Sequence, residues 1–272
     1  MAKKKTARPS QASRADKYDL YLRSVQVPEH ETMMFARFFR SVFKRPALTL
    51  REDFCGTAGI CAAWVRGQPH RRAIGVDLDP EPLSWGLEHN VGALPEKARE
   101  RVLLVKGDVR TLKSPPVDVL SAQNFSFFTF KTRKDLLLYF KAARGNLKKE
   151  GIFVLDMLGG GDVQKEDEEE TRNLPGFTYV WEQVRFDPIT AECLFRIHYR
   201  FPDGSEISPA FEYEWRLWTL PEVREVLLEA GFSKVEVYWE GTTRRGKGDD
   251  NWKKQTSAES DPAWVAYVVA IK

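Results

Sequence analysis

The sequence predicts an α/β fold with a mostly parallel sheet and helices on both faces. Strand-like apolar runs alternate with amphipathic helical segments from about residue 45 to 160, which is typical of a parallel sheet. Small or acidic residues follow these runs, and such sheets bind ligands at the carboxyl ends of their strands. The chain of 272 residues, 42% of them hydrophobic, has enough apolar material for one large domain.

The N-terminal region is expected to contain a tail and then helices. Residues 1–16 are basic and lack the apolar segment of a secretory signal, so a disordered tail is predicted. Residues 17–44 place apolar side chains at helical spacing, and Pro46 ends that pattern. We therefore place one domain at 17–272, beginning with N-terminal lid helices.

Residues 45–160 form the predicted core. The strand-like runs lie at 46–50, 71–79, 101–109, 116–128 and 152–161. The predicted helices lie at 59–67, 80–91 and 133–151. The last helix is expected to end at Gly151, because glycine commonly follows a helix.

The second half of the chain changes character after the fifth strand. Residues 161–218 are predicted to be an antiparallel insert, in which the charge run at 165–172 is a solvated loop or helix face and "FPDGSEI" turns a hairpin. Residues 219–272 return to a helix at 220–232 and strands at 233–241 and 263–272. The polar segment at 242–262 is expected to be a loop, so the sheet has seven strands.

Composition excludes several classes of protein. Lys+Arg 42 against Asp+Glu 39 leaves a net charge of +3, which makes nucleic acid an unlikely partner. The three cysteines form no CxxC pair and the four histidines lack ligand spacing, so no metal site is predicted. No apolar run approaches the roughly 20 residues of a membrane helix. We expect a soluble cytoplasmic protein without a membrane partner, and its oligomeric state stays open.

The residues after the strands point to a nucleoside-containing ligand. Asp77 lies about 20 residues beyond the glycine turn, the spacing of an acid that pairs with ribose hydroxyls, although it could instead cap the helix at Pro80. Asp108 follows the third strand, where it could accept from an adenine amine or simply form a turn. Glu52 and Asp53 flank the turn, repel a pyrophosphate and favour a cationic ligand group.

These segments together resemble class I S-adenosylmethionine-dependent methyltransferases over about residues 18–272. The matching segments are "EDFCGTAG", "GVDLDPEPL", "KGDV", "LKKEGIFVLDML" and "LPEVREVLLEAGFSKVEVYW". The hairpins after the fifth strand resemble the small-molecule branch, such as glycine and amino-sugar N-methyltransferases. The resemblance implies a Rossmann-like fold, the cofactor S-adenosyl-L-methionine, and methyl transfer to an N or O atom of a small-molecule acceptor.

The resemblance also implies roles for individual residues. Glu52 or Asp53 would hold the methionine ammonium, Asp77 the ribose and Asp108 the adenine amine. Phe54 departs from the glycine usual in the family, so the choice between the two acids stays open. The other implied cofactor contacts are Gly56, Thr57, Ala58, Leu78, Val109, Gln123 and Asn124, with Tyr18, Tyr21 and Arg23 in the lid.

Acceptor contacts are expected from aromatic and basic residues. The candidates are Phe125, Tyr213, Arg216 and Trp218. Methyl transfer mainly needs an aligned acceptor, so no catalytic residue is assigned. His198, Cys55 and Cys61 are interpreted as structural.

Two other functions remain open from the sequence. An RNA or protein methyltransferase would use the basic tail and "RRGKG" at 244–248. A non-catalytic nucleotide-cofactor-binding protein, or an NAD-type protein with the same kind of fold, would retain a nucleotide without transferring a methyl group.

Overall fold

The computed structural model describes residues 9–242 and 248–272, and it separates into two compact units. Unit 1 combines the described part of Met1–Gln26 with Gln164–Trp215, and unit 2 combines Val27–Val163 with Arg216–Lys272. Of the predicted lid segment, residues 17–26 belong to unit 1 and residues 27–44 to unit 2. Residues 1–8 of the basic tail and 244–247 of "RRGKG" lie outside the described residues.

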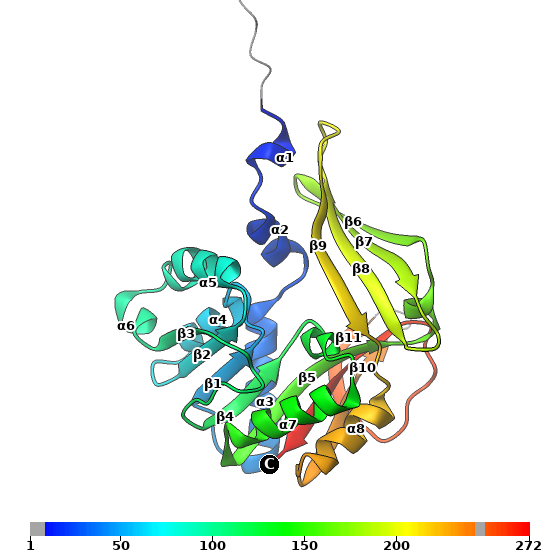
Figure 1. Cartoon of the computed structure of the whole chain (residues 1–272). Helices are drawn as coiled ribbons and strands as arrows, with labels where there is room; N and C mark the ends of the chain where they lie inside the picture. The colour runs from blue at the N-terminus through cyan, green and yellow to red at the C-terminus, as the bar shows by residue number, and fades with distance from the viewer. Residues whose placement is uncertain (1–8, 243–247) are drawn as a thin grey trace, which may run out of the picture. The chain divides into compact units, whose positions relative to one another are not determined.

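Unit 2 is built on a sheet of eight strands (Figure 1). Across the sheet they are β3 (Val102–Lys106), β2 (Arg72–Asp77), β1 (Thr49–Asp53), β4 (Val117–Ala122), β5 (Leu147–Gly159), β12 (Trp264–Ile271), β10 (Lys234–Thr242) and β11 (Gly248–Gln255). The first five strands are parallel, β12 is antiparallel to β5 and β10, and β11 is antiparallel to β10. β11 corrects the expected loop at 242–262 and adds an eighth strand to the predicted seven.

Helices cover both faces of this sheet, as expected. On one face α3 (Pro28–Phe43) and α4 (Gly59–Gly67) pack on β1, β4 and β5 through Phe38, Trp64 and Val154. On the other face α7 (Arg133–Gly145) packs on β5, where Phe153 contacts Phe140, and α8 (Leu220–Glu229) packs on α7 and β10 (Figure 1). The remaining helical segments are α5 (Pro80–Gly86), η1 (Leu87–Val91), α6 (Glu96–Arg99), η2 (Ser126–Thr129) and η3 (Gly161–Gln164).

Two helix boundaries differ from the prediction for local reasons. α7 ends at Gly145 rather than Gly151, because the Asn146 side chain donates to the carbonyl of Ala142 and the chain then enters β5. α5 starts at Pro80 with Asp79 as its N-cap, whose carboxylate accepts from the Glu81 amide at 2.9 Å. Asp77 is therefore not the cap of this helix.

Unit 1 contains a four-stranded sheet in the order β6 (Glu168–Leu174), β7 (Phe177–Phe186), β8 (Glu192–Arg200) and β9 (Glu206–Arg216). One face of this sheet packs Ile197 and Tyr199 against Leu20 of α2 (Lys17–Ser24). The opposite face carries His198, whose ring nitrogens lie 2.7 Å from Ser208 Oγ and 2.9 Å from Glu182 Oε2. His198 thus links three strands.

Two segments of unit 1 are more ordered than predicted. The charge run at 165–172 enters β6, where Glu169 pairs with Arg200 at 2.6 Å, and charged side chains are common on such edge strands. α1 (Gln11–Arg14) lies within the tail expected to be disordered through residue 16. Its first amide donates to Asp203 Oδ2 at 2.7 Å.

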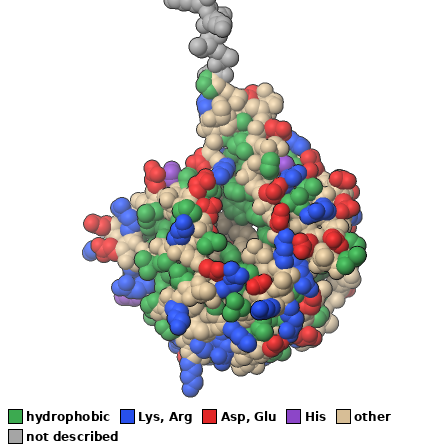
Figure 2. Space-filling model, viewed as in Figure 1, with side chains coloured by type: hydrophobic (Ala, Val, Ile, Leu, Met, Phe, Trp, Pro, Cys, Tyr) green, Lys and Arg blue, Asp and Glu red, His purple; other side chains and the backbone are tan. Residues whose placement is uncertain are grey.

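The distribution of charged side chains and the character of the helices can be compared with the composition of the sequence. In Figure 2, Lys and Arg side chains are interspersed with Asp and Glu over the visible face. Among the described residues, no helix combines the length and apolar character required to cross a bilayer.

Candidate functional site

The turn after β1 has an unusual backbone. Phe54, Gly56 and Ala58 all have positive φ angles, of 57°, 50° and 57°. The turn brings the chain from β1 into α4 within five residues, and Ala58 is the N-cap of that helix. The Phe54 ring packs against Tyr139 of α7, with ring centres 5.5 Å apart. Phe54, where the resemblance leads us to expect glycine, therefore places a half-buried ring against α7.

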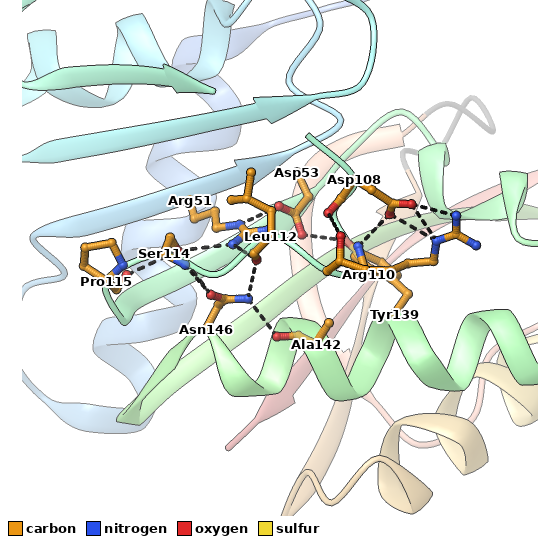
Figure 3. Close-up of polar contacts among 11 residues, drawn as sticks. Arg51, Asp53, Asp108, Arg110, Leu112, Ser114, Pro115, Tyr139, Ala142 and Asn146 are labelled. Atoms are coloured by element: carbon orange, nitrogen blue, oxygen red, sulfur yellow. Dashed lines mark hydrogen bonds and ion pairs between the residues drawn. The ribbon is translucent and has the colours of Figure 1, made fainter. Parts of the chain in front are cut away.

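Asp53 belongs to a buried polar network below this turn (Figure 3). Arg51 Nε lies 2.6 Å from Asp53 Oδ1, both side chains are fully buried, and the Tyr139 hydroxyl donates to Asp53 Oδ2 at 3.2 Å. Arg51 Nη1 also donates to the Leu112 carbonyl and to Ser114 Oγ. Burial raises the pKa of Asp53 to about 6, and Arg51 opposes that rise. Asp53 therefore anchors β1 to the α7 side of the sheet.

Glu52 points to the opposite face because successive strand residues alternate. The Cys61 amide of α4 donates to Glu52 Oε2 at 3.1 Å. Burial raises the pKa of Glu52 to about 8, with further contributions from the negative charges of Asp77 and Glu31. Within the described residues, no lysine or arginine pairs with Glu52.

Asp77 connects the end of β2 to the same turn. Its Oδ2 accepts from the Gly56 amide at 2.7 Å and its Oδ1 from the Asp79 amide at 3.0 Å. Burial raises the pKa of Asp77. The next residue, Leu78, leaves 66% of its surface exposed, so a large apolar side chain stands beside the carboxylate.

Asp108, after β3, is paired with Arg110 (Figure 3). Arg110 Nη2 lies 2.7 Å from Asp108 Oδ2, and this pairing lowers the pKa of the carboxyl. Val109 between them is buried. Asp108 is therefore ionised and partly exposed, but its charge is compensated within the protein.

The ends of β4 and β5 are joined by Asp156. Asn124 and Phe125 both have φ near 56°, and their amides donate to Asp156 Oδ2 and Oδ1 at 2.8 and 2.9 Å. Two adjacent non-glycine residues with left-handed backbone conformations store strain, and such strain is frequent at ligand sites. Gln123 donates to the Val154 carbonyl at 3.1 Å. Burial raises the pKa of Asp156 to about 7.

Glu31 is a further acid near these strand ends, and Tyr267 is its hydrogen-bond partner. No sequence pattern predicted either residue. The Tyr267 hydroxyl lies 3.0 and 2.9 Å from the two oxygens of Glu31. Burial, together with the charge of Asp156, raises the pKa of Glu31 to about 8. Glu31 lies in the first turn of α3 among other acidic residues, so only the tertiary structure distinguishes it.

Glu31, Glu52, Asp77 and Asp156 form an acidic cluster at the carboxyl edge of the unit 2 sheet. None of them has a lysine or arginine partner among the residues that the structure describes. No group of side chains in the described ranges has metal-binding geometry. Buried carboxyl groups without a cationic partner are costly to ionise, so a positively charged ligand would relieve the cluster.

The expected lid and acceptor residues are divided between the units. In unit 1, Arg23 pairs with Asp19, while Tyr21 lies 5.0 Å from Phe211 between ring centres. The other residues there are Tyr18, which is buried, and Tyr213, which packs against Trp181 and Trp215. In unit 2, Arg216 lies over the buried Trp218 ring and donates to the Lys131 carbonyl.

Comparison with known proteins identifies the fold. No protein-family model and no curated protein sequence matches the chain. Among solved structures, DesVI of Streptomyces venezuelae has a TM-score of 0.67 at 18% identity, covering 96% of this chain and 99% of its own. CalS10 of Micromonospora echinaspora, an amino pentose methyltransferase solved with bound S-adenosylmethionine, has a TM-score of 0.65 at 18% identity, covering 94% and 97%. The sugar N-methyltransferase KedS8 of Streptoalloteichus has a TM-score of 0.63 at 18% identity, covering 100% and 98%.

Likeness at this level of identity shows the fold, and the expected Rossmann-like α/β architecture is thereby confirmed. β1 lies between β2 and β4, so the strand order runs outward from β1 to one side through β2 and β3 and to the other through β4 and β5. The place beside β1 where the order reverses is the switch point of the sheet. Ligands of open α/β sheets bind at this switch point. The acidic cluster and the strained turns lie at the carboxyl ends of the strands around it.

Proposed function

We propose that this protein is an S-adenosylmethionine-dependent methyltransferase that acts on an N or O atom of a small-molecule acceptor. The acidic cluster at the switch point carries the proposal. S-adenosylmethionine bears an ammonium and a sulfonium, so it supplies the positive charge that the cluster lacks. A dinucleotide would instead bring a pyrophosphate to the same carboxylates, which is unfavourable.

The environments of the acids favour particular cofactor contacts. Glu52 suits the ammonium better than Asp53, which is already bound to Arg51 and Tyr139. Each oxygen of Asp77 accepts one amide hydrogen bond, and a carboxylate oxygen has a second lone pair for a ribose hydroxyl. Leu78 supplies an apolar surface for adenine.

The remaining contacts follow from the ends of the next strands. Asp108 could accept from the adenine amine, with Val109 beside it, because its carboxylate is ionised and partly exposed. Gln123 and Asn124 end β4, in the region where we place the methyl donor. In the proposal Gly56, Thr57 and Ala58 pass their backbone close to the methionine part. Tyr18, Tyr21 and Arg23 belong to unit 1, and their contact with the methionine carboxylate stays a prediction of the sequence.

The chemistry requires little from the protein beyond orientation. When bound, S-adenosylmethionine supplies a methyl group whose bond to sulfur breaks as a bond to the acceptor forms. The chain's own residues would hold the cofactor and align the acceptor, which is catalysis by proximity. Phe125 and Tyr213 are partly exposed and suit acceptor contact, whereas Arg216 and Trp218 also have structural partners.

The acceptor class and the compartment are parts of the same proposal. The antiparallel sheet of unit 1 follows β5 directly, and the solved structures of similar fold include two sugar methyltransferases. We therefore favour a small amine-bearing or hydroxylated acceptor over RNA or protein. All three cysteines are buried and form no disulfide within the described residues, in keeping with a reducing compartment such as the cytoplasm.

Calorimetric titration with S-adenosylmethionine, S-adenosylhomocysteine and NAD tests the cofactor. Micromolar binding of the first two, weakened at least about tenfold in Asp77→Ala, is expected from the loss of hydrogen bonds to a charged group. Asp79→Asn is the matched control, because Asp79 lies in the same turn and caps α5. Binding of NAD alone, or no binding, would contradict the proposal. Formation of S-adenosylhomocysteine with a panel of amino sugars would then test the acceptor class.

A further inference from the structure

Two neighbouring rows of side chains on the α3 face of the sheet carry much of the acidic cluster. Glu52 of β1 is the register partner of Ser121 of β4, and Asp156 of β5 is the register partner of Tyr267 of β12. Glu31 approaches the second of these rows from the first turn of α3, where it accepts from Tyr267. Strands far apart in sequence therefore present their polar groups to one region.

The same two rows contain polar atoms without partners among the described residues. Ser121 Oγ and Gln123 Oε1 are buried and form no hydrogen bond within the described residues. Ser121 is fully buried and Gln123 is 5% exposed, and both face the side of the sheet that carries Glu52. Orphaned groups of this kind are rare in folded proteins unless a ligand or water satisfies them. The region therefore has the character of a ligand pocket.

We propose that Glu31, positioned by Tyr267, is a second carboxylate for the ammonium of the cofactor's amino acid part. The inference rests on the proposed function and deepens it. An ammonium has three N–H donors and therefore suits several acceptors at once. Glu52 reaches this region from β1 and Glu31 from α3, so two elements on one face of the sheet hold a single positive group.

The hydrogen bonds leave capacity for this ligand. Tyr267 has one hydroxyl hydrogen, which can serve only one oxygen of Glu31 at a time, so the other oxygen can accept from the ammonium. Glu52 already accepts from the Cys61 amide through Oε2. The raised pKa values of both glutamates reflect burial and nearby negative charge, which a bound cation would relieve.

The consequence is selectivity for the amino acid part of the ligand. S-adenosylhomocysteine and 5′-methylthioadenosine share adenosine and a neutral thioether sulfur, and only the first has an ammonium. Glu31 should therefore contribute to the affinity for the first ligand and hardly to that for the second.

The test is calorimetric titration of the full chain and of Glu31→Gln with both ligands. Gln keeps the size of the side chain and an acceptor for Tyr267 but removes the charge. Affinity for S-adenosylhomocysteine should fall at least about tenfold, since hydrogen bonds to charged groups are the strong ones. Affinity for 5′-methylthioadenosine should stay within about twofold on the same grounds.

Glu29→Gln is the matched control, because Glu29 lies in the same turn of α3 but points to Arg66 at the surface. It should leave both affinities unchanged. Equal affinity of Glu31→Gln and the unmodified chain for S-adenosylhomocysteine would overturn the inference, and so would an equal loss for both ligands. If the unmodified chain bound neither ligand, the proposed function itself would fail.

Discussion

Glu52→Gln should stabilise the unliganded protein near neutral pH while weakening cofactor binding. Glu52 is buried, and folding raises its pKa from the usual 4.5 to about 8. The native state therefore holds this proton more tightly than the unfolded state does, so stability falls as pH rises from about 4.5 toward 8. Gln resembles the protonated acid and can still accept from the Cys61 amide.

The size of the effect follows from the two pKa values. One proton linked to folding changes the free energy of unfolding by about 1.4 kcal/mol per pH unit. With the pKa of Glu52 raised from 4.5 to about 8, the free energy of unfolding falls by about 2.5 kcal/mol between pH 5 and pH 7. Glu31 and Asp156 add slopes of the same sign, because their pKa values are also raised. The difference in the free energy of unfolding between the unmodified chain and Glu52→Gln isolates the contribution of Glu52. It corresponds to roughly 5–10 °C in melting temperature at neutral pH.

The assay is thermal and urea unfolding of both proteins from pH 5 to pH 8 without cofactor. The two curves should lie closest at pH 5 and diverge as pH rises, with Glu52→Gln the more stable. Titration with S-adenosylhomocysteine should show weaker binding by the variant at least about tenfold. Parallel curves across the whole range would refute the account of Glu52 as a destabilised binding residue, and so would a less stable variant at pH 8.

Three further predictions follow from the same site. Cofactor affinity should rise about tenfold or more from pH 6 to pH 8 as the raised-pKa carboxyls ionise and pair with the ammonium; calorimetry in a pH series measures it, and a flat or falling profile would contradict the charge argument. Asp156→Asn should lower stability by roughly 1–3 kcal/mol in urea, because one acceptor of the turn after β4 becomes a donor facing a backbone amide; an unchanged midpoint would count against it. Gly86→Ala should destabilise by a similar roughly 1–3 kcal/mol and weaken cofactor binding, because its Cβ would lie 2.2 Å from the Thr57 carbonyl oxygen; Gly145→Ala, with no atom within 4 Å, should be near neutral.

Much of the unit 2 sheet could be predicted because its signals are local. The buried strands β4 and β5 read as apolar runs, and Gly56 and Asp77 lie at recognisable spacing. β6 and β11 were wrongly predicted as loops, since edge strands rich in charged residues lack an apolar pattern. Tertiary pairing determines their conformation.

The site was predictable in outline but not in its assignments. The alternation of β1 places Glu52 and Asp53 on opposite faces, but the sequence does not show that Arg51 and Tyr139 satisfy Asp53. Glu31 joins the cluster only because α3 packs across a sheet that also contains Tyr267. Glu31 and Tyr267 are 236 positions apart, so no local sequence pattern indicates that they pair.

The position of β12 has a consequence for synthesis of the chain on the ribosome. β12 follows β5 and β10 in sequence but lies between them in the sheet. Until residues 264–271 emerge, the edges of β5 and β10 that pair with β12 stay unpaired, and there is no Tyr267 to hold Glu31. The proposed ammonium site therefore cannot form before β12 has emerged, and a nascent chain halted before β12 should be unable to retain the cofactor.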